Sequence, residues 1–152
     1  MKKISGFTLM ELMTVIAIIA VIMAIAVPNL IAWRFNHQLN GSVREVQALI
    51  NAARTDAMKN NAAVDIKIDT DNRKILSEYT NRVTGASPPP KEVLLRPGVS
   101  IKSENFTEDD DENAFSFNAR GIPTEAGRIV LENSGGKTRA VAMTLTGTTR
   151  IE

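Results

Sequence analysis

The chain of 152 residues contains no cysteine and a single histidine, His37. The absence of cysteine excludes disulfide bonds, thiolate catalysis and thiolate metal ligands. One histidine cannot supply the histidine pair of a metal site, and the chain has no glycine-rich phosphate loop and no glycine-x-serine-x-glycine nucleophile elbow. We therefore predict that the protein is not an enzyme and uses no cofactor and no metal, with His37 as a solvated or interfacial side chain.

An excess of charge of one sign is also missing. Lys and Arg number 18 and Asp and Glu 17, which gives a formal net charge of +1. Binding to nucleic acid needs clustered cationic side chains, so nucleic acid is not an expected partner. Arg139 and Arg150 are the late arginines that could come together, and they are the candidate pair if DNA is bound after all.

A local exception is the acidic run from Glu108 to Glu112. Its adjacent carboxylates are hard oxygen ligands of the kind that calcium prefers. Calcium loops, however, place ligands at alternate positions around a glycine, and this run has neither feature. We expect a solvated loop, with calcium binding as the alternative.

The chain does contain a long apolar run between Met10 and Arg34, which is interrupted by one charged residue, Glu11. At about 1.5 Å per residue, the part from Leu12 to Ala32 reaches about 30 Å, the thickness of the hydrocarbon core of a bilayer. The basic residues that precede it, Lys2 and Lys3, place the N-terminus in the cytoplasm by the positive-inside rule. The sequence therefore predicts a single membrane-spanning helix with the C-terminal part across the membrane.

Glu11 is the most informative residue of this run. A carboxylate in the centre of a membrane helix costs about 2.5 to 3.5 kcal/mol, and less near an interface, so it normally persists where a partner compensates it. No cationic side chain lies near Glu11 on the same face of the helix. We infer that the compensating group comes from another molecule, which indicates a subunit of an assembly.

The segment Gly6-Phe7-Thr8-Leu9-Met10-Glu11 resembles the processing site of the type IV pilin and type II secretion pseudopilin superfamily. The resemblance implies that a prepilin peptidase cuts between Gly6 and Phe7 and that Phe7 is then N-methylated. It also implies that Glu11 pairs with the terminal amine of a neighbouring subunit during filament assembly. Pro28 stands where many members of the superfamily have a proline.

Two other interpretations of the N-terminus remain open. An ordinary secretory signal would be cut after the apolar region, and Ala24-Ile25-Ala26 loosely fits the small-residue pattern of such a site. A simple single-pass anchor would need no more than the span and its flanking lysines. The secretory signal leaves Glu11 unexplained, and its apolar region would be too long.

Past the membrane, apolar residues continue at spacings of three and four, which is typical of an amphipathic helix; they are Leu39, Val43, Val46, Ile50, Ala53 and Ala57. Asn60-Asn61 is the expected end of this helix. Pro28 removes one amide donor and should bend the helix, either to help helices pack in a filament or as a tolerated kink. We divide the chain into a leader (1–6), a transmembrane and assembly helix (7–33), its amphipathic continuation (34–60) and a β domain (61–152).

After residue 61 the period changes to two, which predicts β-strands. The expected strands are 64–68, 74–80, 92–96, 99–104, 114–118, 128–133, 138–145 and 148–151, separated by turns at Pro97-Gly98 and Ser134-Gly135-Gly136 and by a proline-rich loop at 85–90. A run of short antiparallel strands after one long helix predicts an α+β fold. In this fold the N-terminal helix packs on an antiparallel sheet or sandwich.

The run from Phe115 to Pro123, followed by an expected glycine turn at Gly127, resembles the C-terminal domain of the GspH/FimT group of minor pilins and pseudopilins. Phe115 and Phe117 share one face of a strand and should be core. Arg120 is expected to bond local carbonyls in a turn, with a binding role as the alternative. DNA-binding members of the group carry a C-terminal glycine-arginine-x-arginine signature, whereas here threonine replaces one arginine before Arg150.

These resemblances imply a minor pseudopilin of a type II secretion pseudopilus, or alternatively a minor type IV pilin that acts in pilus assembly or DNA uptake. The implied partners are other pilins or pseudopilins through the N-terminal helix, the prepilin peptidase and methyltransferase, the inner-membrane assembly platform and the lipid bilayer. The implied location is the bacterial inner membrane, with the C-terminal domain in the periplasm and the subunit in a filament after assembly.

Overall fold

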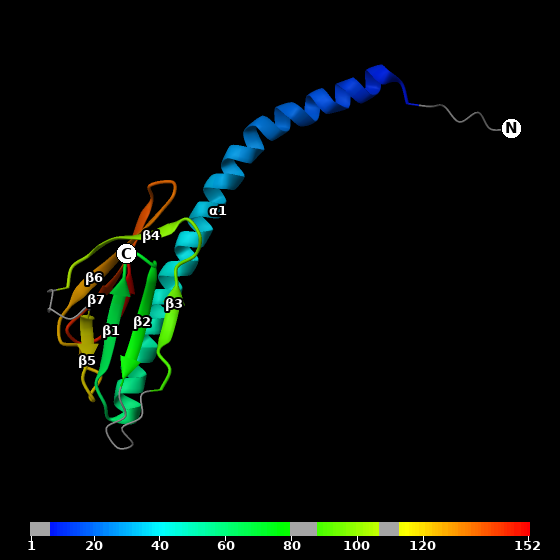
Figure 1. Cartoon of the computed structure of the whole chain (residues 1–152). Helices are drawn as coiled ribbons and strands as arrows, with labels where there is room; N and C mark the ends of the chain where they lie inside the picture. The colour runs from blue at the N-terminus through cyan, green and yellow to red at the C-terminus, as the bar shows by residue number, and fades with distance from the viewer. Residues whose placement is uncertain (1–6, 80–87, 107–112) are drawn as a thin grey trace. The chain divides into compact units, whose positions relative to one another are not determined.

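A computed structural model of the chain describes residues 7–79, 88–106 and 113–152 (Figure 1). The chain divides into two compact units, Met1–Arg34 and Phe35–Glu152. The helix α1, Leu9–Asn60, contributes its first half to one unit and its second half to the other. The leader, half of the loop expected at 85–90 (residues 85–87) and the acidic run at 108–112 lie outside the described residues.

In the second unit, the predicted apolar stripe of α1 is confirmed, because all six of its residues are buried. The helix ends at Asn60 as predicted. Asn61 has a φ of 48°, and the Ala62 N–H donates to the Ala57 carbonyl at 3.2 Å. This is the bond of a Schellman cap, which asparagine supports because it tolerates the left-handed conformation better than most residues.

Eight strands follow the helix (Figure 1): β1 Val64–Asp69, β2 Lys74–Tyr79, β3 Lys91–Leu94, β4 Val99–Glu104, β5 Asn113–Phe117, β6 Gly127–Asn133, β7 Thr138–Met143 and β8 Thr149–Ile151. They form two four-stranded sheets, in the orders β3-β2-β1-β5 and β4-β6-β7-β8. All neighbouring strands are antiparallel. The predicted α+β fold is confirmed.

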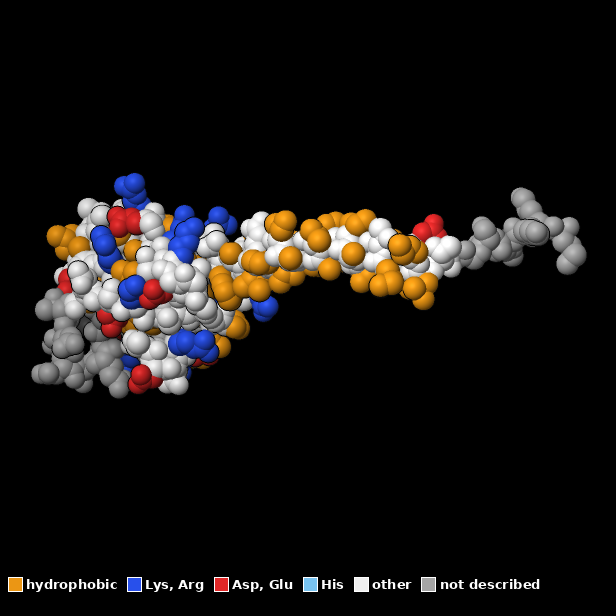
Figure 2. Space-filling model, turned by 90° about the horizontal axis from the view of Figure 1, so that it is seen from above, with side chains coloured by type: hydrophobic (Ala, Val, Ile, Leu, Met, Phe, Trp, Pro, Cys, Tyr) orange, Lys and Arg blue, Asp and Glu red, His pale blue; other side chains and the backbone are white. Residues whose placement is uncertain are grey.

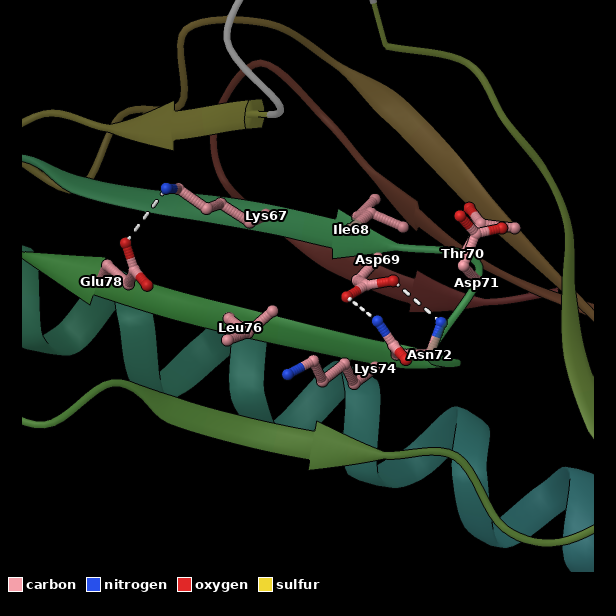
Figure 3. A pocket seen from close by; sticks show the side chains of 9 residues that line it. All are labelled: Lys67, Ile68, Asp69, Thr70, Asp71, Asn72, Lys74, Leu76 and Glu78. Atoms are coloured by element: carbon pink, nitrogen blue, oxygen red, sulfur yellow. Dashed lines mark hydrogen bonds and ion pairs between the residues drawn. The ribbon is translucent and has the colours of Figure 1, made fainter.

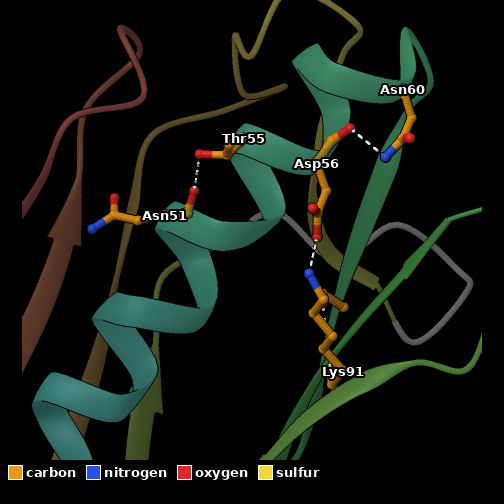
Figure 4. Close-up of polar contacts among 6 residues, drawn as sticks. Asn51, Thr55, Asp56, Asn60 and Lys91 are labelled. Carbon is orange, nitrogen blue, oxygen red and sulfur yellow. Dashed lines mark hydrogen bonds and ion pairs between the residues drawn. The ribbon is translucent and has the colours of Figure 1, made fainter.

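The core of this unit combines side chains from α1 and from both sheets. Phe115 and Phe117 are buried, as predicted, and meet edge to face with ring centroids 5.6 Å apart. Polar contacts join the helix to both sheets. Asp56 pairs with Lys91 of β3, and the Gln47 side chain donates to the Thr149 carbonyl of β8 at 3.3 Å (Figure 4 shows the first contact).

The turn expected at Gly127 is wrong, since Gly127 is the first residue of β6. A Cβ atom at this position would lie 2.1 Å from the Phe106 ring. The glycine is therefore required by the close approach of an aromatic ring to the strand rather than by a turn. At Gly121 the expected turn conformation is present, with a φ of 72°.

Candidate functional site

The first half of α1 carries a continuous apolar surface that the rest of its own unit does not cover. Every residue from Phe7 to Arg34 is exposed, with Leu9 at 77% and Ile25 at 75% of full exposure. Hydrophobic side chains cover the face of this segment seen in Figure 2. By length and composition, α1 could cross a membrane. An apolar surface of this size needs lipid or other helices around it.

At the start of α1, Thr8 and Glu11 bond each other reciprocally. The Glu11 N–H donates to the Thr8 hydroxyl oxygen at 3.2 Å. The Thr8 N–H and the Thr8 hydroxyl each donate to Glu11 Oε2 at 3.1 Å. The Thr8 carbonyl accepts the first helical bond, from Leu12, at 3.2 Å. This arrangement is a capping box, in which a threonine before the helix and a glutamate three residues later satisfy each other's amides.

The capping box shows that the Glu11 carboxylate is partly compensated within its own chain. The sequence predicts no compensating group for this charge within its own chain, but in the structure Oε2 accepts two hydrogen bonds from Thr8. The signal for this cap in the sequence is a threonine-x-x-glutamate spacing before an apolar run, which the prediction from the sequence missed. Among the residues that the structure describes, no hydrogen bond is made to Oε1. The second oxygen thus remains available to a cationic group from outside.

The other residues predicted to act in processing and assembly lie along the same segment. Phe7 is 79% exposed just before the helix, whereas Gly6 lies outside the described residues. Pro28 lies inside α1, which is continuous from Leu9 to Asn60. Phe7 and Glu11 are four residues apart, so after a cut at Gly6 the new amine and the carboxylate belong to the same end of the segment.

The candidate DNA pair is not brought together on one surface. Arg139 is opposite the buried Leu131, on the face of β7 that turns toward the core. Arg150 is opposite Ala142, and residues 139 and 142 point to opposite faces because side chains alternate along a strand. On its own face, Arg150 shares a row with Arg128, which pairs with Glu152 at 3.3 Å. The two candidates therefore do not form a cationic cluster.

The arginine that bonds the turn carbonyls is Arg54 of α1 and not Arg120. Arg54 Nε donates to the Gly121 carbonyl at 3.0 Å, and Nη1 donates to the Gly147 carbonyl at 2.9 Å. Arg120 is exposed, and its side chain makes no hydrogen bond within the described part of the chain. The Asn118 side chain closes the turn by accepting from the Arg120 and Ile122 N–H groups at 2.9 and 3.0 Å.

A hollow lies on the outer side of the β1–β2 hairpin (Figure 3). Its lysines are paired with carboxylates, Lys67 with Glu78 at 3.2 Å and Lys74 with Glu92 at 3.9 Å. Asp69 accepts from the backbone and side-chain nitrogens of Asn72, both at 2.8 Å. Among the described residues, no group of His, Asp and Glu side chains could hold a metal ion. These paired charges stabilise the hairpin and give no sign of a ligand.

Two family models match the chain. The model for the type II transport protein GspH matches residues 42–149, and the model for the prokaryotic N-terminal methylation motif matches residues 1–27. The first covers nearly all of the helix-and-sheet unit, and the second covers the capping box and most of the apolar segment.

Known proteins of similar sequence and structure agree with these matches. A fimbrial protein of Pseudomonas aeruginosa is 47% identical over 53 residues, which is 35% of this chain and 34% of that protein. The pilin-like protein PilA1 of Thermus thermophilus is 27% identical over 97% of both chains. The minor pseudopilin EpsH of the Vibrio cholerae type 2 secretion system superposes with a TM-score of 0.60 at 14% identity, over 76% of this chain and 96% of EpsH. The minor pilin FimU of P. aeruginosa gives 0.58 at 17% identity, over 77% and 90%.

Proposed function

Because the chain belongs to the GspH family within the type IV pilin and pseudopilin superfamily, we propose that it is a minor pseudopilin of a type II secretion pseudopilus that supports protein export across the outer membrane. The family is one of structural subunits rather than enzymes. The observation that supports secretion over a pilus is the match over residues 42–149 to a family described as the type II transport protein GspH. The N-terminal segment supports the role of a filament subunit in either system.

The proposed cycle begins with the precursor in the inner membrane, N-terminus in the cytoplasm and the 35–152 unit in the periplasm. Prepilin peptidase cuts between Gly6 and Phe7, and the new amine is methylated on Phe7. A methylated amine keeps its positive charge, so it remains a partner for a carboxylate. The exposed apolar helix stays in lipid until the assembly platform brings it beside other pilin-type helices.

Glu11 then selects the position of the incoming neighbour. Its Oε2 is held by Thr8, which fixes the carboxylate at the start of the helix, and its Oε1 accepts from the amine of the neighbouring subunit. A hydrogen-bonded ion pair is strong where water is scarce, and a buried charge left alone is costly. The pair therefore favours ordered polymers over separate helices in the bilayer.

The alternative is a minor pilin of a type IV pilus. It is favoured by the match to PilA1 over nearly its whole length and by the likeness in fold to FimU. Pilus assembly and secretion use the same features of the N-terminal helix, so the structure of this segment does not decide between them. A DNA-binding role is the least supported, because Arg139 and Arg150 lie on opposite faces of their sheet.

The test has two parts. Mass spectrometry of the mature N-terminus, in parent cells and in cells without the peptidase, should find a methylated Phe7 in the parent alone. Deletion of the gene should then reduce export of secreted proteins while twitching and transformation stay normal. An intact leader in parent cells would contradict the proposal that the chain is a filament subunit. Loss of twitching with normal export would instead assign the chain to a type IV pilus.

A further inference from the structure

Exposed apolar side chains gather at one place in the second unit. Among its described residues, the large apolar side chains that are exposed are Met58, Leu94, Ile122 and Leu145. Leu94 lies on β3, whereas the other three come from segments that meet near the end of α1. We call Met58, Ile122 and Leu145 the apolar patch. Single exposed apolar residues are normal, but a group of them indicates a surface that another molecule covers.

Arg54 brings the three segments of the apolar patch together. Its guanidinium bonds the carbonyls of Gly121 and Gly147, which lie in the turns that carry the other two patch residues. Met58 lies one turn after Arg54, near the end of α1 seen in Figure 4. A Cβ atom added at Gly121 would lie 2.9 Å from Met58 Sδ, so the helix and the first turn are in contact.

The two turns are also held by their own hydrogen bonds. The Asn118 side chain accepts from the Ile122 N–H at 3.0 Å. In the other turn, the Gly147 N–H donates to the Thr144 carbonyl at 2.8 Å, and the Thr148 N–H donates to the Thr144 hydroxyl at 3.3 Å. A surface that is fixed before binding loses little conformational freedom when a partner arrives, which favours affinity.

Cationic side chains border the apolar patch. Lys59 follows Met58, and Arg120 lies two residues before Ile122; both are exposed, and neither forms an ion pair among the described residues. Arg54 adds a third positive charge, and its hydrogen bonds go to carbonyls rather than to carboxylates. A partner that covers this surface has to bring carboxylates, because a charge left unpaired in an interface is costly.

The position of the patch indicates which partner can reach it. The second unit begins at Phe35, which is joined directly to the apolar segment, and Met58 lies about 35 Å of helix further on. New subunits leave the membrane, so the filament that already exists lies beyond the far end of the unit. Methionine and arginine are enriched in interfaces between proteins, which favours a protein domain as the occupant.

We propose that the apolar patch, together with Lys59 and Arg120, binds the domain of a different pilin-type subunit, which presents an apolar side chain flanked by carboxylates. The inference rests on the proposed function in one respect, namely that the chain is a filament subunit. It adds a contact between folded domains to the contact between N-terminal helices.

Photo-cross-linking of the full chain in cells tests this surface. A benzoylphenylalanine residue replaces Leu145 in one strain and Leu94 in a second; the two positions are matched, because both leucines are 63% exposed. Mass spectrometry identifies the cross-linked products. We expect the probe at residue 145 to form, several-fold more than the probe at 94, an adduct with another protein that has its own N-terminal methylation motif and an acidic domain.

Charge variants then test the chemistry of the partner. In the chain with the probe at residue 145, Arg120→Glu combined with Lys59→Glu should lower the adduct several-fold, because an acidic partner then meets like charges. Arg120→Lys should retain most of it. The control Lys137→Glu lies in the β6–β7 turn, which contacts Phe35 through Gly135, and should leave the adduct unchanged. All the replaced side chains are exposed, so urea unfolding of each variant should match the parent.

The outcomes separate this inference from the proposed function. If export and the methylated N-terminus are normal but the probe at 145 gives no more pilin-type adduct than the probe at 94, the patch is not the docking surface and the proposed function stands. An adduct with an exported protein instead overturns the choice of partner, and an adduct that the double charge reversal leaves unchanged overturns its acidic character. An uncut leader contradicts the proposed function and removes the inference with it.

Discussion

At the scale of single residues, Arg54 makes the contact that we expect to contribute most to the stability of the β loops. It bonds two carbonyls in turns that lie far apart in sequence, at Gly121 and Gly147. Both glycines have positive φ values, 72° and 76°, so the turns hold a conformation that other residues resist. Without the guanidinium, two carbonyls lose a charged donor.

We therefore expect Arg54→Ala to lower the free energy of unfolding by about 1.5 to 3 kcal/mol, the range for hydrogen bonds that involve a charged group. The matched control is Arg120→Ala in the adjoining turn, which should change it by less than about 0.5 kcal/mol, as is usual for an exposed side chain. Urea unfolding of the mature chain in detergent measures both. Equal effects of the two variants would show that Arg54 is not the residue that joins the turns.

Two aspartates of β1 respond to pH in opposite directions. Hydrogen bonds from the Asn72 side chain and backbone hold the pKa of Asp69 below its usual range. Its ionised form therefore stabilises the fold above the unfolded pKa, and this contribution is lost as the pH falls through the lowered value. Burial raises the pKa of Asp65, with Lys67 opposing and Glu78 assisting the shift. Its ionised form destabilises the fold, and that cost appears as the pH rises from the usual pKa through the raised one.

We predict that Asp69→Asn is less stable than the parent at pH 7 and that the difference disappears in acid. Asp65→Asn should be more stable than the parent at pH 7, and this difference should also disappear in acid. Unfolding free energies measured between pH 7 and the acid range, on the same preparation, check both signs. A loss of stability at pH 7 in Asp65→Asn would contradict the assignment of burial as the main cause.

At the scale of elements, the sequence predicts those helix and strand features that follow from the spacing of residues close together in the chain. The stripe from Leu39 to Ala57 and the helix end at Asn60 follow from spacing and from the conformational tolerance of asparagine. The strand bounds agree to within about two residues for the same reason. The order of strands in the two sheets could not be predicted, because it depends on pairings such as β1 with β5 that join segments far apart in the chain.

The contacts of the candidate site also differ in whether the sequence could predict them. The capping box of Thr8 and Glu11 is local and was available from the spacing of the two residues. The role of Arg54 was not available, because the two turns that it bonds meet only in the folded unit. Likewise, the separation of Arg139 from Arg150 follows from strand register and not from the composition of the C-terminal segment.

Gly127 gives a prediction at this scale. An added methyl group would meet the Phe106 ring, which also stacks on Phe115 at a centroid distance of 4.6 Å. Gly127→Ala should lower the free energy of unfolding by about 1 to 3 kcal/mol, as overpacking does. Phe106→Ala removes the obstacle, so the double variant should be destabilised by less than the sum of the single ones. If the free-energy changes of the two single variants add up exactly in the double variant, the Phe106 ring is not what excludes a side chain at residue 127.

At the scale of the whole molecule, the two units differ in how much of their apolar surface is buried. The residues of the core begin at Leu39, whereas every residue from Phe7 to Arg34 is exposed. Among the described residues, the core cluster is therefore made of residues of the second unit, which has enough buried apolar surface to fold as a domain of ordinary size. This division suits a subunit whose helix moves from lipid into a filament while its domain remains folded in water.

The last prediction concerns this division. A fragment of residues 35–152 should be soluble without detergent and monomeric, and should unfold cooperatively. A fragment of residues 45–152 should be destabilised severely, because it loses Leu39 and Val43, which are 1% and 0% exposed. Removal of one large buried aliphatic side chain typically costs about 2 to 5 kcal/mol, a large part of the stability of a small domain. Circular dichroism, calorimetry and analytical ultracentrifugation compare the two fragments. If 35–152 aggregates or unfolds without cooperativity while the full chain in detergent is stable, the first unit supports the fold of the second, and helix and domain act as one body.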